Sequence, residues 1–155
     1  MEEIKETIIE LFSDIAEIHG HSRSLGKIYA ILYLADKPLC IEDIVKELGM
    51  SKGNVSMNLN KLEEIGLVKK IWIKGDRRNY YRCVGSFSSY KDIVKRKYET
   101  ISRACDKLKR LKEKYNIDES SSISKKLKRI ERMGEVSRRV LEVLEEIDKD
   151  LGEEI

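Results

Sequence analysis

Two short segments with helical periodicity lie almost end to end between residues 41 and 66. The first carries apolar residues at the i, i+3, i+4 and i+7 positions of one face and ends at Gly49, a residue type that readily takes the left-handed conformation at a helix end. The second begins after Ser51, a favourable N-cap, and ends at Gly66. Its apolar face consists of Val55, Leu59 and Leu62. Two short helices joined by a tight glycine-containing turn form a helix-turn-helix motif.

The segment after Gly66 is strand-like. Residues 67–73 and 79–84 are rich in Val, Ile, Trp and Tyr, and a Lys-Gly-Asp-Arg-Arg segment, residues 74–78, separates them. This pattern predicts a β-hairpin, or wing, with a cationic tip. A single acid within the basic tip indicates that Asp76 pairs with a nearby arginine and sets the shape of the loop, which leaves the other arginine free.

Helical periodicity continues on both sides of this module. Residues 4–18 have the 4,3,4,3 apolar spacing of a helix seam, and a further helix is predicted to stop before Pro38. Residues 87–115 predict a helix of about 40 Å, which is longer than a small domain can cover, so we expect it to pack on another element. A polar turn and a last long helix follow, with an irregularity expected around Gly134.

These patterns predict a mainly α chain with a winged helix-turn-helix, a small β-hairpin wing and long terminal helices that dimerise. The expected division is an N-terminal dimerisation helix at 1–20, a winged helix-turn-helix DNA-binding domain at 24–86 and a helical dimerisation region at 87–155.

Charge is strongly segregated along the chain, although the net charge is only +3. Residues 67–82 hold six basic residues against one acidic residue, and residues 83–114 hold ten against four. The segments 1–19 and 115–155 are net acidic. A basic middle flanked by acidic ends favours a polyanionic partner.

Other classes of site have little support in the sequence. Three widely spaced cysteines, Cys40, Cys83 and Cys105, contain no C-x-x-C pair, so buried thiols are expected in place of a disulfide framework or a zinc site. His19 and His21 flank a glycine with no further ligands nearby, so no metal is expected. No cofactor and no catalytic grouping are predicted, hence no enzyme. Without an 18-residue apolar run, a cytoplasmic protein with no membrane partner is expected.

Asparagine is concentrated on the second helix of the motif. The chain has no glutamine and five asparagines, and three of these, Asn54, Asn58 and Asn60, fall within seven residues. A face that is merely solvated is the alternative, but glutamate and lysine are better helix formers than asparagine and abundant in this chain. Because asparagine can offer a donor and an acceptor together to adenine in the major groove, the cluster favours DNA reading.

A helical projection divides this helix into faces. With Val55 toward the core, Gly53, Met57 and Asn60 lie roughly opposite, whereas Asn58 lies nearer the core. Ser51 and Gly53 leave the start of the helix open for backbone N–H contacts to phosphate.

Residues 38–84 resemble a winged-helix module of the MarR superfamily, through the segment IEDIVKELG, the segment SKGNVSMNLNKLEEIGLV and a wing ending in GDRRNYY. The wing and the paired C-terminal helices look most like the GbsR-type branch. The resemblance implies a dimeric transcriptional regulator, often a repressor, with Arg77 and Arg78 as wing contacts. It also implies that six residues of the second helix face DNA: Ser51, Lys52, Asn54, Ser56, Met57 and Lys61. Many members of the superfamily carry arginine where this chain has Met57.

The sequence therefore predicts a homodimeric repressor that binds double-stranded DNA at an inverted-repeat operator. Residues 51–65 would enter the major groove, and wing residues 74–78 would lie on the backbone or minor groove. The predicted DNA-binding residues are Ser51, Lys52, Gly53, Asn54, Ser56, Met57, Asn60, Lys61, Lys74, Arg77 and Arg78, with Asp76 structuring the wing. A small-molecule effector is a further expected partner. The alternative is a winged-helix interaction subunit whose same surface binds an acidic protein.

Overall fold

The computed structural model describes residues 1–84 and 86–151, which form six helices and three short strands. The chain divides into two compact units, Met1–Ser86 and Phe87–Ile155. Residues 152–155, the end of the predicted helical region, lie outside the described part. Among the described residues, no helix is both long and apolar enough to cross a membrane.

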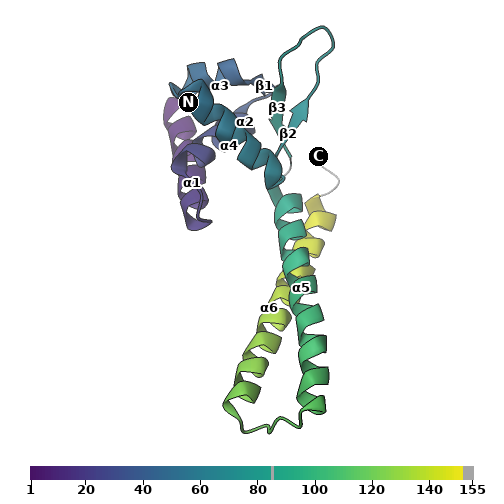
Figure 1. Cartoon of the computed structure of the whole chain (residues 1–155). Coiled ribbons are helices and arrows are strands. Elements are labelled where there is room, and N and C mark those ends of the chain that lie inside the picture. The colour runs from purple at the N-terminus through teal and green to yellow at the C-terminus, as the bar shows by residue number, and fades with distance from the viewer. Residues whose placement is uncertain (85, 152–155) are drawn as a thin grey trace. The chain divides into compact units, whose positions relative to one another are not determined.

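The first unit contains four helices and a small sheet (Figure 1). The helices are α1 (Glu2–Ile18), α2 (Arg23–Leu34), α3 (Ile41–Leu48) and α4 (Lys52–Glu64). The predicted turn between α3 and α4 is present, because Gly49 ends α3 with a left-handed φ of 63°. The predicted helix-turn-helix and the mainly α fold are confirmed.

The sheet has the strand order β1-β3-β2 and is antiparallel throughout. Strands β2 (Val68–Ile71) and β3 (Tyr80–Cys83) form the predicted hairpin. Strand β1 (Leu39–Cys40) pairs with β3 and was not predicted, because two residues are too few to show an alternating pattern. This third strand joins the start of α3 to the hairpin.

A single apolar core holds the helices of the first unit to the sheet. Its fully buried side chains come from α2, α3, α4 and β2, and they include Ile28, Ile44, Val55, Leu59, Leu62 and Val68. Helix α1 packs on α2 through Phe12, whose ring meets the Tyr29 ring edge-on at 4.9 Å between centroids. The two helices approach so closely that a Cβ added at Gly26 would lie 2.3 Å from the carbonyl oxygen of Phe12.

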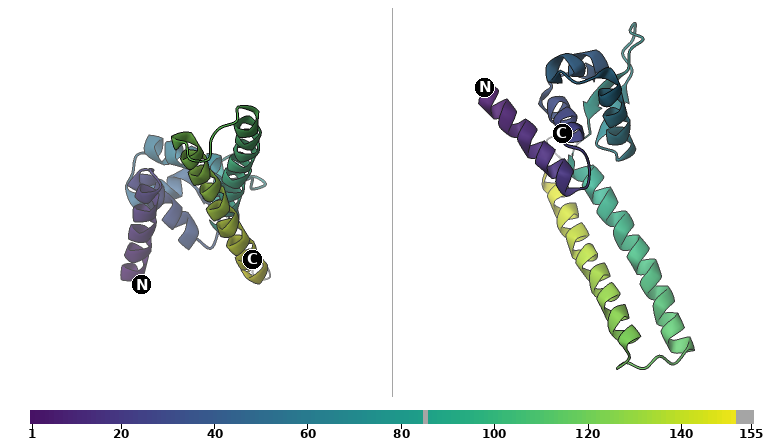
Figure 2. Two further views of the ribbon diagram at one scale, coloured as in Figure 1. Left: turned by 90° about the horizontal axis from the view of Figure 1, so that it is seen from below. Right: turned by 60° about the vertical axis from the view of Figure 1, so that its left-hand side comes forward.

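The second unit is an antiparallel pair of long helices, α5 (Ser86–Lys114) and α6 (Ser122–Leu151), joined by a turn in which Asn116 has a φ of 48° (Figure 2). Val94 of α5 packs with Leu141 and Leu144 of α6. The prediction of an irregularity around Gly134 was wrong, since α6 is a continuous helix there. A Cβ at Gly134 would lie 3.1 Å from Ile101, so this glycine permits close helix packing and does not interrupt the helix.

The α1–α2 contact gives a stability prediction. Gly26→Ala should destabilise the first unit by about 1–3 kcal/mol or more, because the new methyl group meets main-chain atoms that cannot move aside. Gly53→Ala is the matched control. A Cβ at Gly53 meets nothing within 4 Å, so alanine should stabilise α4 by about 0.5–1 kcal/mol. Urea unfolding of both variants measures the difference, and equal midpoints would contradict the packing argument.

Candidate nucleic-acid interface

Helix α4 is held firmly along one edge and at both ends. Its apolar edge, Val55, Leu59 and Leu62, is fully buried. At the N-terminus, Ser51 Oγ accepts a hydrogen bond from the Asn54 backbone N–H at 3.2 Å, as the predicted N-cap requires. At the C-terminus, Gly66 has a left-handed φ of 81°. The direction of every other side chain on α4 follows from this anchoring.

The opposite face of α4 is polar and exposed. Gly53 and Asn60 are exposed, as is Met57, whose exposed fraction is 66%. Asn54, Ser56 and Lys61 are partly buried along the edges of this face. The helical projection therefore predicted the exposed and buried faces of α4 correctly, including the position of Asn58, which is 5% exposed.

The two lysines of α4 are already paired with acidic side chains. Lys52 Nζ lies 3.1 Å from Glu42 Oε1 of α3, and Lys61 Nζ lies 3.1 Å from Glu64 Oε2 on the next turn of α4. Both pairs are exposed, so each is worth little and is readily exchanged for another anion. The face of α4 thus offers amides and hydroxyls, with little uncompensated charge.

The wing is organised around one carboxylate. Asp76 accepts hydrogen bonds from the backbone N–H of Arg78 at 2.9 Å, from its guanidinium Nη2 at 2.8 Å and from Tyr80 Oη at 2.7 Å. The Arg78 guanidinium also lies 5.4 Å from the centre of the Tyr80 ring. The sequence predicted that Asp76 pairs with a nearby arginine, and the structure identifies this arginine as Arg78.

These contacts shift the titration of the wing. The guanidinium of Arg78, followed by its backbone N–H and the Tyr80 hydroxyl, holds the pKa of Asp76 well below its ordinary value of 3.8. The hydrogen bond to Asp76 raises the pKa of Tyr80. Asp76 is therefore ionised at neutral pH.

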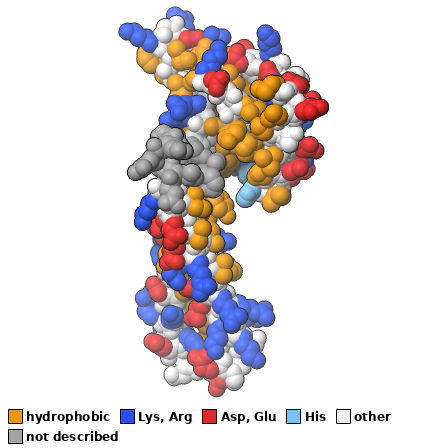
Figure 3. Space-filling view, turned by 180° about the vertical axis from the view of Figure 1, so that it is seen from behind, with side chains coloured by type: hydrophobic (Ala, Val, Ile, Leu, Met, Phe, Trp, Pro, Cys, Tyr) orange, Lys and Arg blue, Asp and Glu red, His pale blue; other side chains and the backbone are white. Residues whose placement is uncertain are grey.

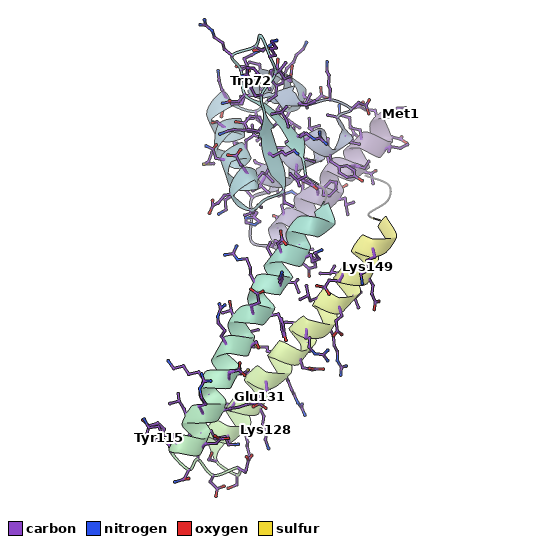
Figure 4. The ribbon with its side chains drawn as sticks, turned by 90° about the vertical axis from the view of Figure 1, so that its right-hand side faces the viewer. Met1, Trp72, Tyr115, Lys128, Glu131 and Lys149 are labelled. Carbon is purple, nitrogen blue, oxygen red and sulfur yellow. The ribbon has the colours of Figure 1, made fainter. Side chains whose placement is uncertain are left out.

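Two other cations at the tip of the wing have no such partner in the part of the chain that the structure describes. Among the described residues, nothing pairs with Lys74 or Arg77, and both are exposed. Trp72, the one tryptophan of the chain, has an exposed fraction of 77% and lies on the wing near the end of β2 (Figure 4). The wing thus offers exposed, unpaired cations beside an exposed aromatic ring, within the same compact unit as α4.

Comparison with known proteins agrees with this arrangement. The family described as bacterial regulatory protein, arsR family, matches residues 26–70, which run from α2 into β2. The HTH-type transcriptional repressor GbsR of Bacillus subtilis (strain 168) is 27% identical over 95 residues, which cover 61% of this chain and 49% of GbsR. The putative HTH-type transcriptional regulator YvaV of the same strain is 22% identical over 147 residues, covering 95% of this chain and 79% of YvaV.

The chain is similar to HTH-type transcriptional regulators such as GbsR. The fold agrees over almost the whole length with a crystal structure of a transcriptional regulator, at a TM-score of 0.72 and 17% identity, covering 96% of this chain and 98% of the other. The predicted resemblance to GbsR-type regulators is confirmed, since GbsR and YvaV are both among the similar proteins. The matched segment spans about half the length of GbsR.

Two side chains shape this candidate interface without having been predicted to do so. Tyr80 shares the carboxylate of Asp76 with Arg78. The signal for it was the alternation of Asp76, Arg78 and Tyr80, which places them on one side of an extended chain. Asn58 contacts Asn54 from the core side. Its signal was the i, i+4 spacing of two asparagines on one helix.

The thiols and histidines form no second site within the described part of the chain. Burial raises the pKa of the Cys83 thiol to about 12, and burial together with Asp43 raises the pKa of Cys40. Both thiols are therefore protonated at neutral pH and poor nucleophiles. Within the described ranges, no three His, Cys, Asp or Glu residues come together as a metal site requires.

Removal of the wing carboxylate should loosen the tip without unfolding the protein. In Asp76→Ala, the backbone N–H of Arg78 loses its acceptor, so its amide should exchange with solvent much faster, whereas global stability should barely change because the site is exposed. Because the pKa of Asp76 is lowered in the folded wing, its contribution is complete above about pH 4 and is lost as pH falls further.

Amide hydrogen exchange followed by NMR measures this effect. The control is Asn79→Ala, since Asn79 is an exposed wing residue that makes no hydrogen bond among the described residues. Unchanged Arg78 exchange in Asp76→Ala would contradict the assigned role.

Proposed function

We propose that this chain is a homodimeric, sequence-specific repressor that binds double-stranded DNA. Helix α4, within residues 51–65, enters the major groove, and the wing at residues 74–78 contacts the backbone or the minor groove. The observation that carries this proposal is the combination, in one compact unit, of an exposed amide and hydroxyl face on α4 with a cationic wing. Amide groups can read base edges, whereas cations hold phosphates without regard to sequence.

The roles of individual residues follow from their surroundings. Asn54 and Asn60 are the proposed base-reading side chains. The proposed phosphate contacts at the start of α4 are Ser51, Lys52 and Gly53, because exposed backbone N–H groups there attract anions. Ser56, Met57 and Lys61 complete the face. On the wing, Arg77 and Lys74 are the proposed DNA contacts, and Arg78 divides its guanidinium between Asp76 and DNA.

The proposed dimer rests on apolar side chains that neither unit buries within itself. Figure 3 shows hydrophobic side chains exposed on the first unit and along the α5–α6 hairpin. On α1 they are Ile4, Leu11, Ile15 and Ile18, and on α6 they are Met133, Val136, Val140 and Val143. Within each set the spacings are three, four or seven residues, as in a helix–helix seam, and a second copy is the proposed occupant. Two-fold symmetry would place the two α4 helices about 34 Å apart, or a multiple of it, and make the operator an inverted repeat.

An effector site is a further part of the proposal. An open cavity of about 480 Å³ lies between α5 and α6 near their connecting turn, where Figure 4 labels Lys128 and Glu131. Its wall includes Cys105, Lys109 and Ser124. This volume is in the range of small-molecule sites. Its wall carries three lysines and three glutamates, so its charge favours neither an anionic nor a cationic compound.

The two surfaces should fail differently when mutated. Arg77→Ala should weaken binding to all duplexes alike and lower the salt slope of binding by about 1, because one fewer counterion is released. Asn54→Ala should cost about 1–3 kcal/mol on the best site and little on random DNA, and it should relax the choice at one base position. Selection from a random duplex pool, followed by titration at several salt concentrations, measures both effects.

Arg82→Ala is the matched control for Arg77→Ala, since it removes the same charge from an exposed position on β3, away from the tip. Arg82→Ala should weaken DNA binding less than Arg77→Ala does. The same experiment tests the alternative of an acidic protein partner. If the wild-type chain binds no duplex above its non-specific affinity at physiological salt, the amide face serves another partner.

The dimer proposal is tested by charge on the α6 seam. Val136, with an exposed fraction of 61%, lies outside the apolar cluster that the described residues of its unit form, so Val136→Lys combined with Val143→Lys should leave the chain folded but monomeric. Glu145→Lys is the control, because it places the same side chain on the opposite face of α6. Sedimentation equilibrium distinguishes the two variants. A double variant that stays dimeric would place the contact elsewhere.

A further inference from the structure

Asn58 is a buried polar side chain that links the core of the first unit to the exposed face of α4. It is 5% exposed and makes three hydrogen bonds. Its Oδ1 accepts from Ser22 Oγ at 3.2 Å, and Ser22 is itself the N-cap of α2. Its Nδ2 donates to the main-chain carbonyl of Asn54 at 2.9 Å and to the side-chain Oδ1 of Asn54 at 2.6 Å. A chain of hydrogen bonds therefore runs from α2 to Asn54.

The chemistry of these contacts determines which way each amide points. The oxygen and nitrogen of a carboxamide have nearly the same shape, so only their partners can distinguish them. A main-chain carbonyl can accept but never donate, so the Asn58 atom beside the carbonyl of Asn54 must be Nδ2. The same nitrogen faces the Asn54 side chain, and the atom it meets there must be the oxygen.

The orientation of Asn54 follows directly. Its Oδ1 is turned inward to Asn58, so its Nδ2 points away from that contact with two N–H donors. Among the described residues, none accepts a hydrogen bond from this nitrogen. Asn54 is partly exposed at the edge of the proposed reading face, which leaves the donor available to a ligand.

We propose that Asn58 is a positioning residue that makes Asn54 a hydrogen-bond donor to DNA, so that the base under Asn54 is read through its acceptors. This inference rests on the proposed entry of α4 into the major groove. Guanine, which presents O6 and N7 as two adjacent acceptors, is the base that best fits an outward NH₂ group. Adenine presents one acceptor and one donor, and it would require Asn54 Oδ1 to turn outward as well. Cytosine offers only a donor in the major groove.

Asn54 is expected to differ from an unconstrained asparagine, which usually pairs with adenine. An unconstrained carboxamide can rotate by 180° at little cost and select whichever base pattern is present. Rotation of Asn54 would leave its NH₂ group facing the Nδ2 of Asn58, a donor against a donor in a place that water reaches poorly. The buried amide of Asn58 therefore favours the orientation in which the NH₂ group of Asn54 faces outward.

The test uses the full-length chain and a pool of random DNA duplexes. Comparison of duplexes selected by the wild type with those selected by Asn54→Ala identifies the base position that depends on Asn54. At that position the wild type should enrich guanine over adenine. In Asn58→Ala the constraint is gone, so the guanine-to-adenine ratio should fall by about 2- to 12-fold, the equivalent of one hydrogen bond.

A second variant should reverse the preference. Asn58→Asp replaces Nδ2 by an oxygen of the same shape, which repels the main-chain carbonyl of Asn54 at 2.9 Å and so costs stability. The same oxygen attracts the NH₂ group of the Asn54 side chain and turns its Oδ1 outward. The selected base should then change toward adenine or cytosine, which carry donors in the major groove. If this variant does not fold, Asn58→Ala and the double variant below still decide the question.

The double variant Asn54→Ala with Asn58→Ala separates positioning from a structural role. If Asn58 acts through Asn54, the double variant should show the same base preferences as Asn54→Ala alone. Ser13→Ala is the control for a lost buried hydrogen bond, because Ser13 is fully buried in α1 and donates to the carbonyl of Ile9 at 2.6 Å. It should lower the unfolding temperature and leave the base preferences unchanged.

The outcomes are distinct. Adenine enriched by the wild type at the Asn54-dependent position would overturn the inference, as would an Asn58→Ala variant that changes only the unfolding temperature. Either result leaves the proposed DNA binding intact. A wild-type chain that enriches no duplex would overturn the proposed function, and the inference with it.

Discussion

The burial of Val55, Leu59 and Leu62 is the constraint on which the candidate interface depends. These three side chains fix the rotation of α4 about its own axis, and the capping bonds of Ser51 and Gly66 fix where the helix starts and stops. Once both are fixed, the outward positions are determined by helical geometry alone. The polar residues of α4 need no contact of their own to point away from the core.

The side chains of the wing are also held in position, but by hydrogen bonds and not by a core. A hairpin tip has too few apolar side chains to be held by a core, so a single carboxylate takes its place. Asp76 gathers a backbone amide, a guanidinium and a phenol within hydrogen-bonding distance. This arrangement orders one arginine and leaves its neighbour in sequence, Arg77, unpaired among the described residues. Of two adjacent arginines, Arg78 is thus held in place, whereas Arg77 is left available to a ligand.

The fold was predictable where a local pattern carries the information. Helical spacing located the helices, Gly49 and Gly66 marked their ends, and Ser51 marked the start of α4. Long-range effects escaped prediction. Strand β1 exists only because β3 lies beside it, and Gly134 is small because Ile101 of another helix needs the space. Both features depend on contacts with another element of the structure, and a local sequence pattern carries no information about such contacts.

In the candidate site, too, features set by a local pattern were predictable and features set by long-range contacts were not. The exposed face of α4 and the pairing of Asp76 were predictable from periodicity and charge. The choice of Arg78 over Arg77, the contribution of Tyr80 and the orientation of Asn54 were not, because each depends on distances across a loop or between a helix and the core. The individual DNA contacts stay predictions.

Under the proposed function, the ion pairs on α4 set the order of events in an encounter with a duplex. Lys52 and Lys61 are neutralised by Glu42 and Glu64, so the helix exerts little attraction at a distance, whereas Arg77 and Lys74 do. An encounter with a polyanion would therefore begin at the wing and depend on ionic strength. Helix α4 would engage only at close range, when phosphates displace the two carboxylates. A protein built this way could scan a duplex by its wing and commit to a site only where the amides of α4 find their partners.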